Sequence, residues 1–497
     1  MKKKLLITAL TVMLFGSALP VYAAPQYMDD GAIFDAEWYL EQNPDVAAAF
    51  PENVSPETLY QHYLTCGITE GRTPYNTTTL NLAEILPNSS STVISTPLAP
   101  SNLTPVVSNN QNAQNYRWYN NYNWNWAETV KSYLCENSDG GVTRVEYIDG
   151  KIIVEDYDNY LYLRSSRTIP MELSLWGGFF AGEKYNFFIF GQENPSENND
   201  TEVIRVVKYS KDWNRLGQVS LRGANTTVPF EAGSLRCAEY GDYLYIRTCH
   251  KMYASPRDGK NHQANLTLAV HQNNMRITDT YYIVMNNSVG YVSHSFNQFV
   301  LIDQERNIVT LDHGDAYPRS IVLMRYNNTK AGEDKFSGSV SSSSLLTFPG
   351  VTGDNHTGAS IGGFAETANG YITALNYDTA NTGIRDVYIS YTNKNGLNST
   401  LTGVTAMAGT LTPILAPTGL DGGYLMWTDI NGIFYYTRYA DGGVIGTVNT
   451  ADAALSDCQP ICHNGEVLWY VTANTTPVFY KLDATGILSK IPANGQY

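Results

Sequence analysis

One unit, a tight turn followed by an apolar strand, occurs seven times along the chain and limits the folds open to it. The turns fall at Asp149-Gly150, Glu183-Lys184, Gly241-Asp242, Asn297-Gln298, Asn369-Gly370, Gly422-Gly423 and Asn464-Gly465. The strands after them are KIIVEDY, YNFFIFG, YLYIRTC, FVLID, YITALNY, YLMWTD and EVLWYV. The units recur every ~50 residues, a period typical of propeller blades and solenoid arrays. We therefore predict a mainly β fold, a β-propeller with seven blades.

Residues 1–23 have the features of a secretory signal peptide. Lys2, Lys3 and Lys4 precede the apolar run LLITALTVMLFG, and Val21-Tyr22-Ala23 follows, with cleavage expected after Ala23. The alternative, a transmembrane anchor, needs ~18 or more apolar residues and a different flank. We therefore expect a protein that is secreted or associated with the cell surface, with no membrane span in its mature form.

Residues 32–75 predict a separate helical module. Apolar and aromatic residues follow helical spacing, and Ser55-Pro56-Glu57 is a helix start. The motifs Trp38-Tyr39-Leu40, Asn43-Pro44-Asp45-Val46, His62-Tyr63-Leu64 and Glu70-Gly71-Arg72 resemble the short helical module found near the termini of secreted and surface proteins of Gram-positive bacteria. The resemblance covers about a tenth of the chain and implies attachment or spacing at the cell surface, with association to the cell wall as one form of it.

Residues 76–115 are rich in Ser, Thr, Asn and Pro, a composition that predicts an unfolded linker. The propeller is then expected over 116–497, with an aromatic lead-in at 116–136 that begins YRWYNNYNWNWA. Two interpretations of this aromatic run stay open. It either stacks on sugar rings or packs against the propeller and helps to close the ring.

Charge argues against nucleic acid as a partner, and cysteine content argues against a disulfide scaffold or a zinc site built from cysteines. The formal net charge is −15 and Lys and Arg form no cluster after the leader, so nucleic acid is not expected to bind. Six cysteines are too few for a disulfide scaffold in a chain of this length, and their spacing does not fit zinc. If Gly241-Asp242 centres a hairpin, Cys237 lies opposite Ile246 rather than Cys249.

The phrases NHQANLTLAV, GYVSHSFNQFV and LDHGDAYPRS are similar to those of uncharacterised secreted bacterial propeller proteins. The resemblance covers roughly two thirds of the chain. It implies a propeller fold and an extracellular setting, and it brings no established activity with it.

Propeller topology predicts where polar side chains gather. The short turns mark one face, and the longer polar excursions at 191–201, 248–264, 312–319, 352–358 and 377–386 mark the opposite, ligand-binding face. Candidate ligand-binding residues on these excursions and the strands beside them are His250, His262, Gln263, His294, His313, Asp315, Arg319, His356 and Glu366. Of these, Glu366 is expected level with His294 on the next inner strand, close enough for an ion pair.

Such a cluster binds a ligand or metal, or performs acid–base chemistry, with Arg319 holding a carboxylate. In the alternative, the same side chains tie down loops that lack sheet partners. Two functional hypotheses follow. The first is a non-catalytic module that binds an extracellular glycan, peptide or protein. The second is a metal-dependent polysaccharide lyase or hydrolase, in which His250, His262, Gln263 and His313 hold a divalent metal by analogy with seven-bladed lyases.

Overall fold

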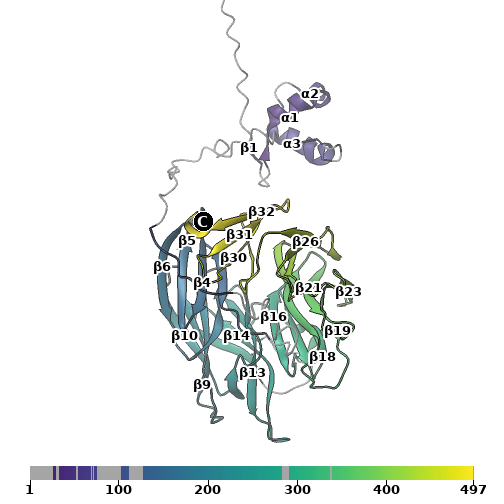
Figure 1. Cartoon of the computed structure of the whole chain (residues 1–497). Coiled ribbons are helices and arrows are strands. Elements are labelled where there is room, and N and C mark those ends of the chain that lie inside the picture. Colours follow the sequence, from purple (N-terminus) through teal and green to yellow (C-terminus); the bar gives the residue numbers. More distant parts are fainter. Residues whose placement is uncertain are drawn as a thin grey trace, which may run out of the picture. The chain divides into compact units, whose positions relative to one another are not determined.

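The computed structural model describes residues 26–28, 33–51, 54–68, 70, 72–74, 102–110, 127–282, 290–335 and 339–495. Contacts divide the chain into two compact units, Met1–Leu98 and Ala99–Tyr497, and each is described by itself (Figure 1). The predicted signal peptide and the aromatic run at 116–126 lie outside the described residues. Within the described part of the chain, every helix is too short or too polar to cross a membrane.

The N-terminal unit is a helical module whose helices begin where capping residues predict. It contains β1 (Gln26–Tyr27), β2 (Ile33–Phe34), α1 (Ala36–Gln42), α2 (Pro44–Ala49), α3 (Pro56–His62) and the π-helical turn η1 (Tyr63–Gly67). The side chains of Asp35 and Ser55 accept hydrogen bonds from backbone N–H groups three residues later, at 2.9 and 3.3 Å, and cap α1 and α3. The buried core comprises Met28, Phe34, Tyr39, Val46, Leu59 and Tyr60.

Arg72 connects two of the sequence motifs of this module. Its guanidinium donates to the carboxylates of Asp45 and Glu70, both at 2.6 Å, and to Asn43 Oδ1 at 3.0 Å. The hydrogen bond from Arg72 lowers the pKa of the Asp45 carboxyl to about 2. The Asn-Pro-Asp and Glu-Gly-Arg motifs are therefore two halves of one polar contact.

The second unit folds into seven antiparallel sheets arranged in a ring, which confirms the predicted seven-bladed propeller (Figure 1). Each sheet is built from strands that are consecutive in the chain, and first strands of neighbouring blades contact one another around the channel. Blades 1 to 3 comprise β3 (Ser132–Glu136), β4 (Val142–Ile148), β5 (Lys151–Tyr157) and β6 (Leu163–Pro170); β7 (Leu175–Ala181), β8 (Asn186–Gly191), β9 (Glu202–Tyr209) and β10 (Arg215–Arg222); and β11 (Thr226–Pro229), β12 (Arg236–Tyr240), β13 (Tyr243–Ala254), β14 (Asn261–His271) and β15 (Arg276–Tyr281). In blade 3, β12 is the first strand on the channel side and β11 pairs with the far end of β13.

The remaining four blades repeat this arrangement. They comprise β16 (Ser295–Ile302), β17 (Asn307–Asp315), β18 (Arg319–Lys330) and β19 (Val340–Thr347); β20 (Ala359–Glu366), β21 (Gly370–Tyr377), β22 (Asp386–Asn393) and β23 (Ser399–Gly403); β24 (Ile414–Gly419), β25 (Gly422–Thr428), β26 (Phe434–Ala440), β27 (Gly443–Val444) and β28 (Asn449–Ala451); and β29 (Ile461–His463), β30 (Glu466–Val471), β31 (Val478–Leu482) and β32 (Leu488–Pro492). The chain ends in a short 3-10 helix, η5 (Ala493–Gly495).

The strand order gives the channel two distinct ends. The turn end carries the connections between first and second strands and between third and fourth strands of each blade. The loop end carries the connections between second and third strands and the links between blades. All five predicted polar excursions lie at the loop end, as the sequence predicts.

Two of the seven predicted turns are misplaced within their blades, and a third is shifted by two residues, because Gly422 and Gly423 begin β25 and the turn falls at Leu420-Asp421. Asp149-Gly150 joins the second and third strands of blade 1, so KIIVEDY is a third strand. Asn297 and Gln298 are buried inside β16, and the turn of that hairpin falls instead at 303–306. Their side chains serve neighbouring blades: Asn297 Nδ2 donates to Ile361 O at 2.7 Å, and Gln298 Oε1 accepts from Ser234 N at 2.8 Å. Polar residues that favour turns here satisfy backbone groups across the ring.

Two predicted excursions are largely strand. His250 lies on β13 and His262 on β14, and these strands form one long hairpin. In the β12–β13 hairpin, Ile246 lies opposite Cys237, as predicted. His313 and Asp315 end β17, and Arg319 begins β18. Continued cross-strand hydrogen bonding extends these hairpins, because polar residues on a strand end still pair their backbone groups.

The ring closes between blade 7 and blade 1, and residues 102–110 lie across that junction. Asn110 N donates to Thr472 O at 3.0 Å, and Asn474 N donates to Ser108 O at 2.7 Å. Asn110 Oδ1 accepts from Thr472 N at 2.8 Å, and Ser108 Oγ donates to Glu146. The prediction of an unfolded linker is therefore wrong for 102–110, because the blades satisfy its polar groups. We call this segment the strap.

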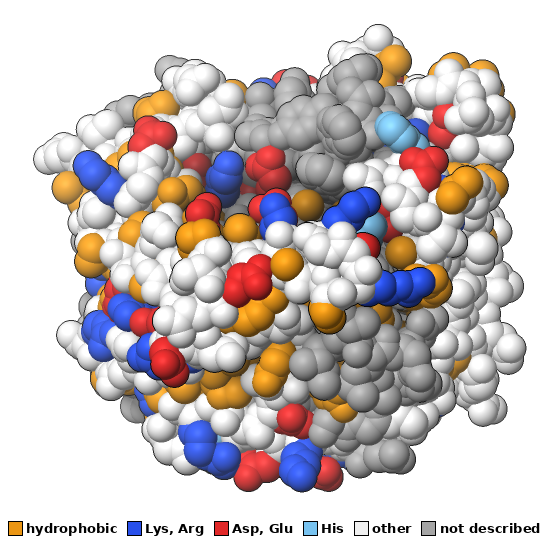
Figure 2. Space-filling model, turned by 90° about the horizontal axis from the view of Figure 1, so that it is seen from below, with side chains coloured by type: hydrophobic (Ala, Val, Ile, Leu, Met, Phe, Trp, Pro, Cys, Tyr) orange, Lys and Arg blue, Asp and Glu red, His pale blue; other side chains and the backbone are white. Residues whose placement is uncertain are grey.

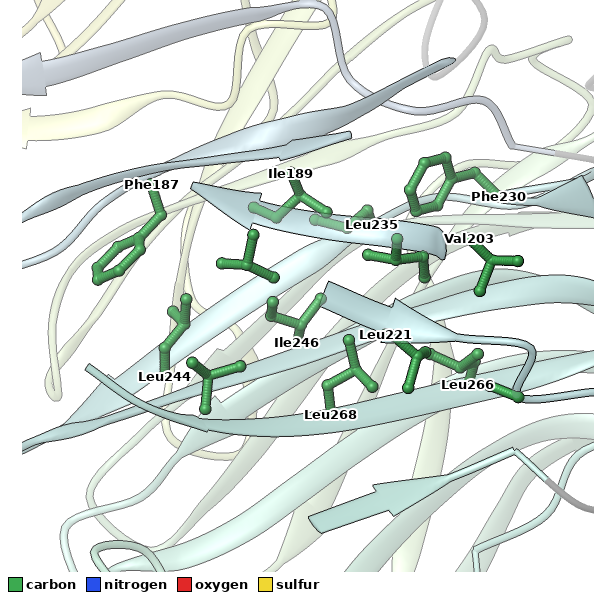
Figure 3. Close-up of a cluster of buried hydrophobic side chains, with 14 residues drawn as sticks. Phe187, Ile189, Val203, Leu221, Phe230, Leu235, Leu244, Ile246, Leu266 and Leu268 are labelled. Atoms are coloured by element: carbon green, nitrogen blue, oxygen red, sulfur yellow. The ribbon is translucent and has the colours of Figure 1, made fainter. Parts of the chain in front are cut away.

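Apolar faces of adjacent blades form the cores. Between blades 2 and 3, side chains from both sheets point toward one another (Figure 3). Those labelled there are Phe187, Ile189, Val203, Leu221, Phe230, Leu235, Leu244, Ile246, Leu266 and Leu268. Blades 7 and 1 share a similar core that includes Leu134, Tyr157, Leu468, Tyr470 and Phe479. Ring closure therefore has an apolar component as well as the strap.

Candidate functional site

Two of the predicted ligand-binding histidines are buried inside blades. His250 shares a hydrogen bond of 2.7 Å between Nδ1 and Thr226 Oγ1, and His313 shares one of 2.7 Å between Nε2 and Thr357 Oγ1. The second ring nitrogen of each has no hydrogen-bond partner among the described residues. Burial lowers the pKa of both imidazoles to about 3, so both are neutral at pH 7. Neither side chain is exposed to solvent at the loop end.

Arg319 is engaged in holding the loop that enters blade 5. Its guanidinium donates to the backbone carbonyls of Pro349 at 2.9 and 3.0 Å, of Asp354 at 2.6 Å and of His356 at 3.2 Å. The exposed His356 ring lies 3.2 Å from Asp354 Oδ1. The structure therefore supports the loop-bracing interpretation for Arg319 rather than a carboxylate clamp.

The fold does bring three of the predicted residues together at the loop end. His294 Nδ1 lies 2.9 Å from Asp315 Oδ1, and the His262 and His294 rings stack with centroids 6.1 Å apart. His262 Nε2 lies 3.0 Å from Asp258 Oδ2. Gln263 turns away, and its amide nitrogen donates to the carbonyl of Ser295.

The predicted ion pair between His294 and Glu366 is wrong. His294 precedes β16 at the loop end, whereas Glu366 ends β20 at the turn end, where it pairs with Lys394 Nζ at 2.6 Å and accepts from Gln304 N at 2.9 Å. The error follows from the misplaced turn at Asn297, which shifted one inner strand against the next.

The four predicted metal ligands do not form a set. His250 bonds to Thr226, His262 to Asp258, Gln263 to Ser295 O and His313 to Thr357. Among the described residues, no group of three or more His, Cys, Asp or Glu side chains is arranged to hold a metal ion. The geometry therefore gives no support to the metal-dependent lyase hypothesis.

A cavity of about 1150 Å³ opens at the turn end, opposite the face that the sequence favoured. The first strands of blades 1, 2, 3 and 7 form its walls, and the turn after β9 forms part of its rim. The lining residues are 133–139, Thr143, Asp156, Arg167, 179–183, Asn186, 211–213, 235–237 and 459–462.

Aromatic rings form a continuous part of this lining. The Phe179 and Trp213 rings stack with centroids 5.9 Å apart, and the Tyr133 ring contacts Phe179 edge-on at 5.6 Å. Hydrogen-bonding groups lie around them: Arg167 Nη2 donates to Asp156 at 2.7 Å, and Lys211 Nζ donates to Asn186 Oδ1 at 3.0 Å. The cavity thus combines flat apolar surfaces with donors and acceptors.

Charge on the propeller surface is mostly paired. Figure 2 shows basic and acidic side chains interspersed over one face, without a single-sign patch among the side chains it describes. Arg205 lies 2.6 Å from Glu202, and Arg215 lies 2.7 Å from Glu172. Arg236, in the cavity, differs: it donates to its neighbour Leu235 O at 3.1 Å, and no described carboxylate lies within ion-pair distance.

Sequence reasoning missed the cavity because its residues come from short turns and from strands far apart in the chain. Histidines in long excursions drew attention to the other end. The sequence did contain one sign of this cavity. Arg236 is a single charged residue at the start of an inner strand, between the apolar Leu235 and Cys237. Lys211-Asp212-Trp213 is a second, since a tryptophan in a short polar turn is unusual.

Comparisons with known proteins place the fold only. No family model matches this chain, and no curated protein matches it. The β-propeller domain of the Trilobed protease from Pyrococcus furiosus aligns at 9% identity over 65% of this chain and 85% of its own, with a TM-score of 0.39. A candidate 6-phosphogluconolactonase from Bacteroides fragilis aligns at 12% identity over 67% and 87%, with a TM-score of 0.39. The SapL1 lectin, solved with α-methyl fucoside, aligns at 8% identity over 74% and 97%, with a TM-score of 0.32. This chain is a seven-bladed propeller by its own strand order, and it has distant structural similarity to these lactonase, protease-propeller and lectin structures.

Proposed function

We propose that this protein is a non-catalytic binding module that takes up an extracellular oligosaccharide in the cavity at the turn end of its propeller. The observation that carries the proposal is the lining of that cavity, in which the rings of Tyr133, Phe179 and Trp213 lie beside hydrogen-bonding side chains. Sugars present the same combination, an apolar ring face edged by hydroxyl groups, and aromatic side chains pack well on such faces.

The size of the cavity favours a ligand of several sugar units. Pockets for drug-sized molecules measure roughly 300–1,000 Å³, and this cavity measures about 1150 Å³. Asp156 accepts hydrogen bonds from Thr143, Ser165 and Arg167 at 2.5 to 2.7 Å, so its carboxylate is occupied rather than available as an acid or base. Binding without conversion fits this arrangement.

The setting of the proposal comes from the N-terminal residues. The predicted leader at 1–23 would export the chain, and the helical module would attach it at the cell surface. The propeller would then hold a glycan of the surrounding matrix or of another cell close to that surface.

A blocked cavity tests the proposal. Ser138 is exposed in the first turn of blade 1 and lines the cavity, so Ser138→Trp fills the mouth without entering a core. Thr379→Trp is the matched control, an equally exposed turn residue at the loop end of blade 5. The mature protein and both variants are applied to a glycan array, and hits are measured by isothermal titration calorimetry.

The expected result is that the wild type and Thr379→Trp bind the same glycans, and that Ser138→Trp loses at least tenfold in affinity. Absence of any glycan ligand would overturn the assignment of a saccharide. Loss in Thr379→Trp alone would move the site to the loop end. Chromatography of the titrated glycan checks that binding is non-catalytic, because cleaved or unsaturated products would mean that the protein is an enzyme.

A further inference from the structure

We propose that the cavity selects acidic saccharides, with Arg236 binding one carboxylate or sulfate of the ligand at the inner strands. This inference rests on the proposed function, because it assumes that a saccharide enters this cavity. It adds the chemical class of the ligand and the residue that recognises it.

Arg236 can be compared with the three fully buried arginines of the described propeller, of which Arg385 donates to Ser360 Oγ at 3.3 Å. Arg144 is buried and lies 2.5 Å from Glu146 and 2.7 Å from Glu155, and the buried Arg247 lies 2.5 Å from Asp312. Arg236 is half-buried and has no described carboxylate within ion-pair distance. Asp457 acts on it only at longer range, and the Asp457 carboxylate accepts hydrogen bonds from Lys131 N and Ser132 Oγ. An enclosed guanidinium without a counter-ion is costly, and the fold avoids it at Arg144 and Arg247. A ligand anion would supply the missing partner.

The groups in contact with the Arg236 guanidinium are uncharged. Its Cζ lies 5.0 Å from the centre of the Phe299 ring, which holds the planar group by its face. The Tyr133 hydroxyl donates to Val130 O at 2.9 Å, so its proton is engaged. Burial raises the pKa of the Cys237 thiol, which therefore stays neutral and gives no counter-charge. The edge of the guanidinium is left to bind a planar or tetrahedral anion in bidentate fashion.

The rim of the cavity carries exposed charges of both signs. Four carboxylates line the cavity on turns or strand ends and are exposed: Glu136, Asp139, Glu183 and Asp212. Water and salt screen exposed charges, whereas an enclosed charge is screened much less. Lys211 is the rim cation nearest to them in the chain and has no described carboxylate within ion-pair distance. The screened carboxylates at the rim would therefore repel an incoming anion only weakly. The enclosed Arg236, which is screened much less, would determine whether an acidic or a neutral sugar binds more tightly.

A pair of probes that differ only in charge tests the inference. Oligogalacturonate carries carboxylates, and its methyl ester has the same rings without the charge. A sulfated galactan oligosaccharide and its desulfated form make the second pair and distinguish sulfate from carboxylate. Affinities are measured by calorimetry on the full mature chain and on Arg236→Gln and Arg236→Lys, with Arg257→Gln as control, since Arg257 is exposed on the loop-end turn of the same blade.

The wild type is expected to bind at least one acidic form at least tenfold more tightly than its neutral partner. Arg236→Gln should remove this preference and leave affinity for the neutral form within about twofold, Arg236→Lys should keep part of it, and Arg257→Gln should change nothing. Without ligand, Arg236→Gln should melt at the same temperature as the wild type or higher, because it removes an enclosed charge without a partner.

Two outcomes overturn the inference. Equal binding of acidic and neutral forms, unchanged in Arg236→Gln, would remove the selection of anions while leaving saccharide binding intact. A melting temperature lowered by several degrees in Arg236→Gln and restored in Arg236→Lys, without any effect on the acidic preference, would make Arg236 a structural residue. If no saccharide of either pair or of the array binds, the proposed function itself fails.

Discussion

A buried imidazole next to one hydroxyl is uncharged at neutral pH, and His250 and His313 both occur in this setting. Each has one ring nitrogen bonded to a threonine, and desolvation lowers the pKa of each to about 3. His262 and His294, at the loop end, remain partly exposed beside carboxylates. The two kinds of histidine therefore differ in role: the first pair packs blades, and the second is open to solvent.

The buried pair makes stability depend on pH. In the unfolded chain a histidine takes up a proton near its ordinary pKa of 6.5, whereas His313 in the fold does so only near 3. Between these values the unfolded state binds more protons, so its contribution is fully present above pH 6.5 and is lost as pH falls toward 3. The slope is at most about 1.4 kcal/mol per pH unit for each histidine.

His313→Gln keeps a partner for Thr357 and cannot titrate in this range. Free energies of unfolding in urea, measured every half pH unit from 7 to 4, should fall less steeply in this variant than in the wild type. His262→Gln, at an exposed site, serves as the control and should keep the wild-type slope. Equal slopes in His313→Gln and the wild type would show that His313 is protonated in the fold.

At the scale of elements, the strap adds polar contacts to the blade junction. Its backbone bonds to the end of β30, and Asn110 alone contacts Thr472, Ser132 and the carbonyl of Tyr470. Asp457 adds a further tie from blade 7 to blade 1 by accepting a hydrogen bond from Lys131 N at 2.6 Å. Because blades 1 and 7 do not share strands, these contacts and the apolar core between them hold the ring shut.

Asn110→Ala should therefore destabilise the propeller. It removes the acceptor of the buried Thr472 N–H, and leaving a buried donor unsatisfied costs about 1–3 kcal/mol. Urea unfolding followed by tryptophan fluorescence measures the change. Thr104→Ala, at an exposed position of the same strap, should stay within about 0.5 kcal/mol of the wild type. Equal stability of the two variants would mean that the apolar core closes the ring without the strap.

For the propeller as a whole, the two ends of the channel differ in structure. The loop end is held by internal hydrogen bonds, such as those of Arg319, whereas the turn end opens into the cavity. Two of the enclosed charges elsewhere, those of Arg144 and Arg247, are matched by carboxylates. Arg236, by contrast, lines the cavity and has no described carboxylate within ion-pair distance.

Chelation tests the whole molecule for a dependence on metal. We expect EDTA followed by gel filtration to leave the melting temperature and the glycan affinity unchanged, because no metal-holding group is present among the described residues. Elemental analysis of the untreated protein supports the measurement. One equivalent of divalent metal in the untreated protein would contradict this expectation if a His262→Ala, His294→Ala double variant lost both the metal and glycan binding. Added metal should then restore neither the bound metal nor glycan binding in that variant.

The sequence by itself determined the features that depend on neighbours along the chain. Alternating strands and a repeat of roughly 50 residues require blades, and Ser55-Pro56 begins α3 as predicted. The strap and the burial of Asn297 and Gln298 inside β16 could not be predicted, because Ser108, Asn297 and Gln298 have the composition of loops and find their partners in other blades. Arg236 became a candidate only when the fold placed it near Phe299, 63 residues away in the chain, and away from any described carboxylate. Periodicity is a local property, whereas the lining of a channel is set by the register between blades, so the tertiary structure alone decided where the cavity lies.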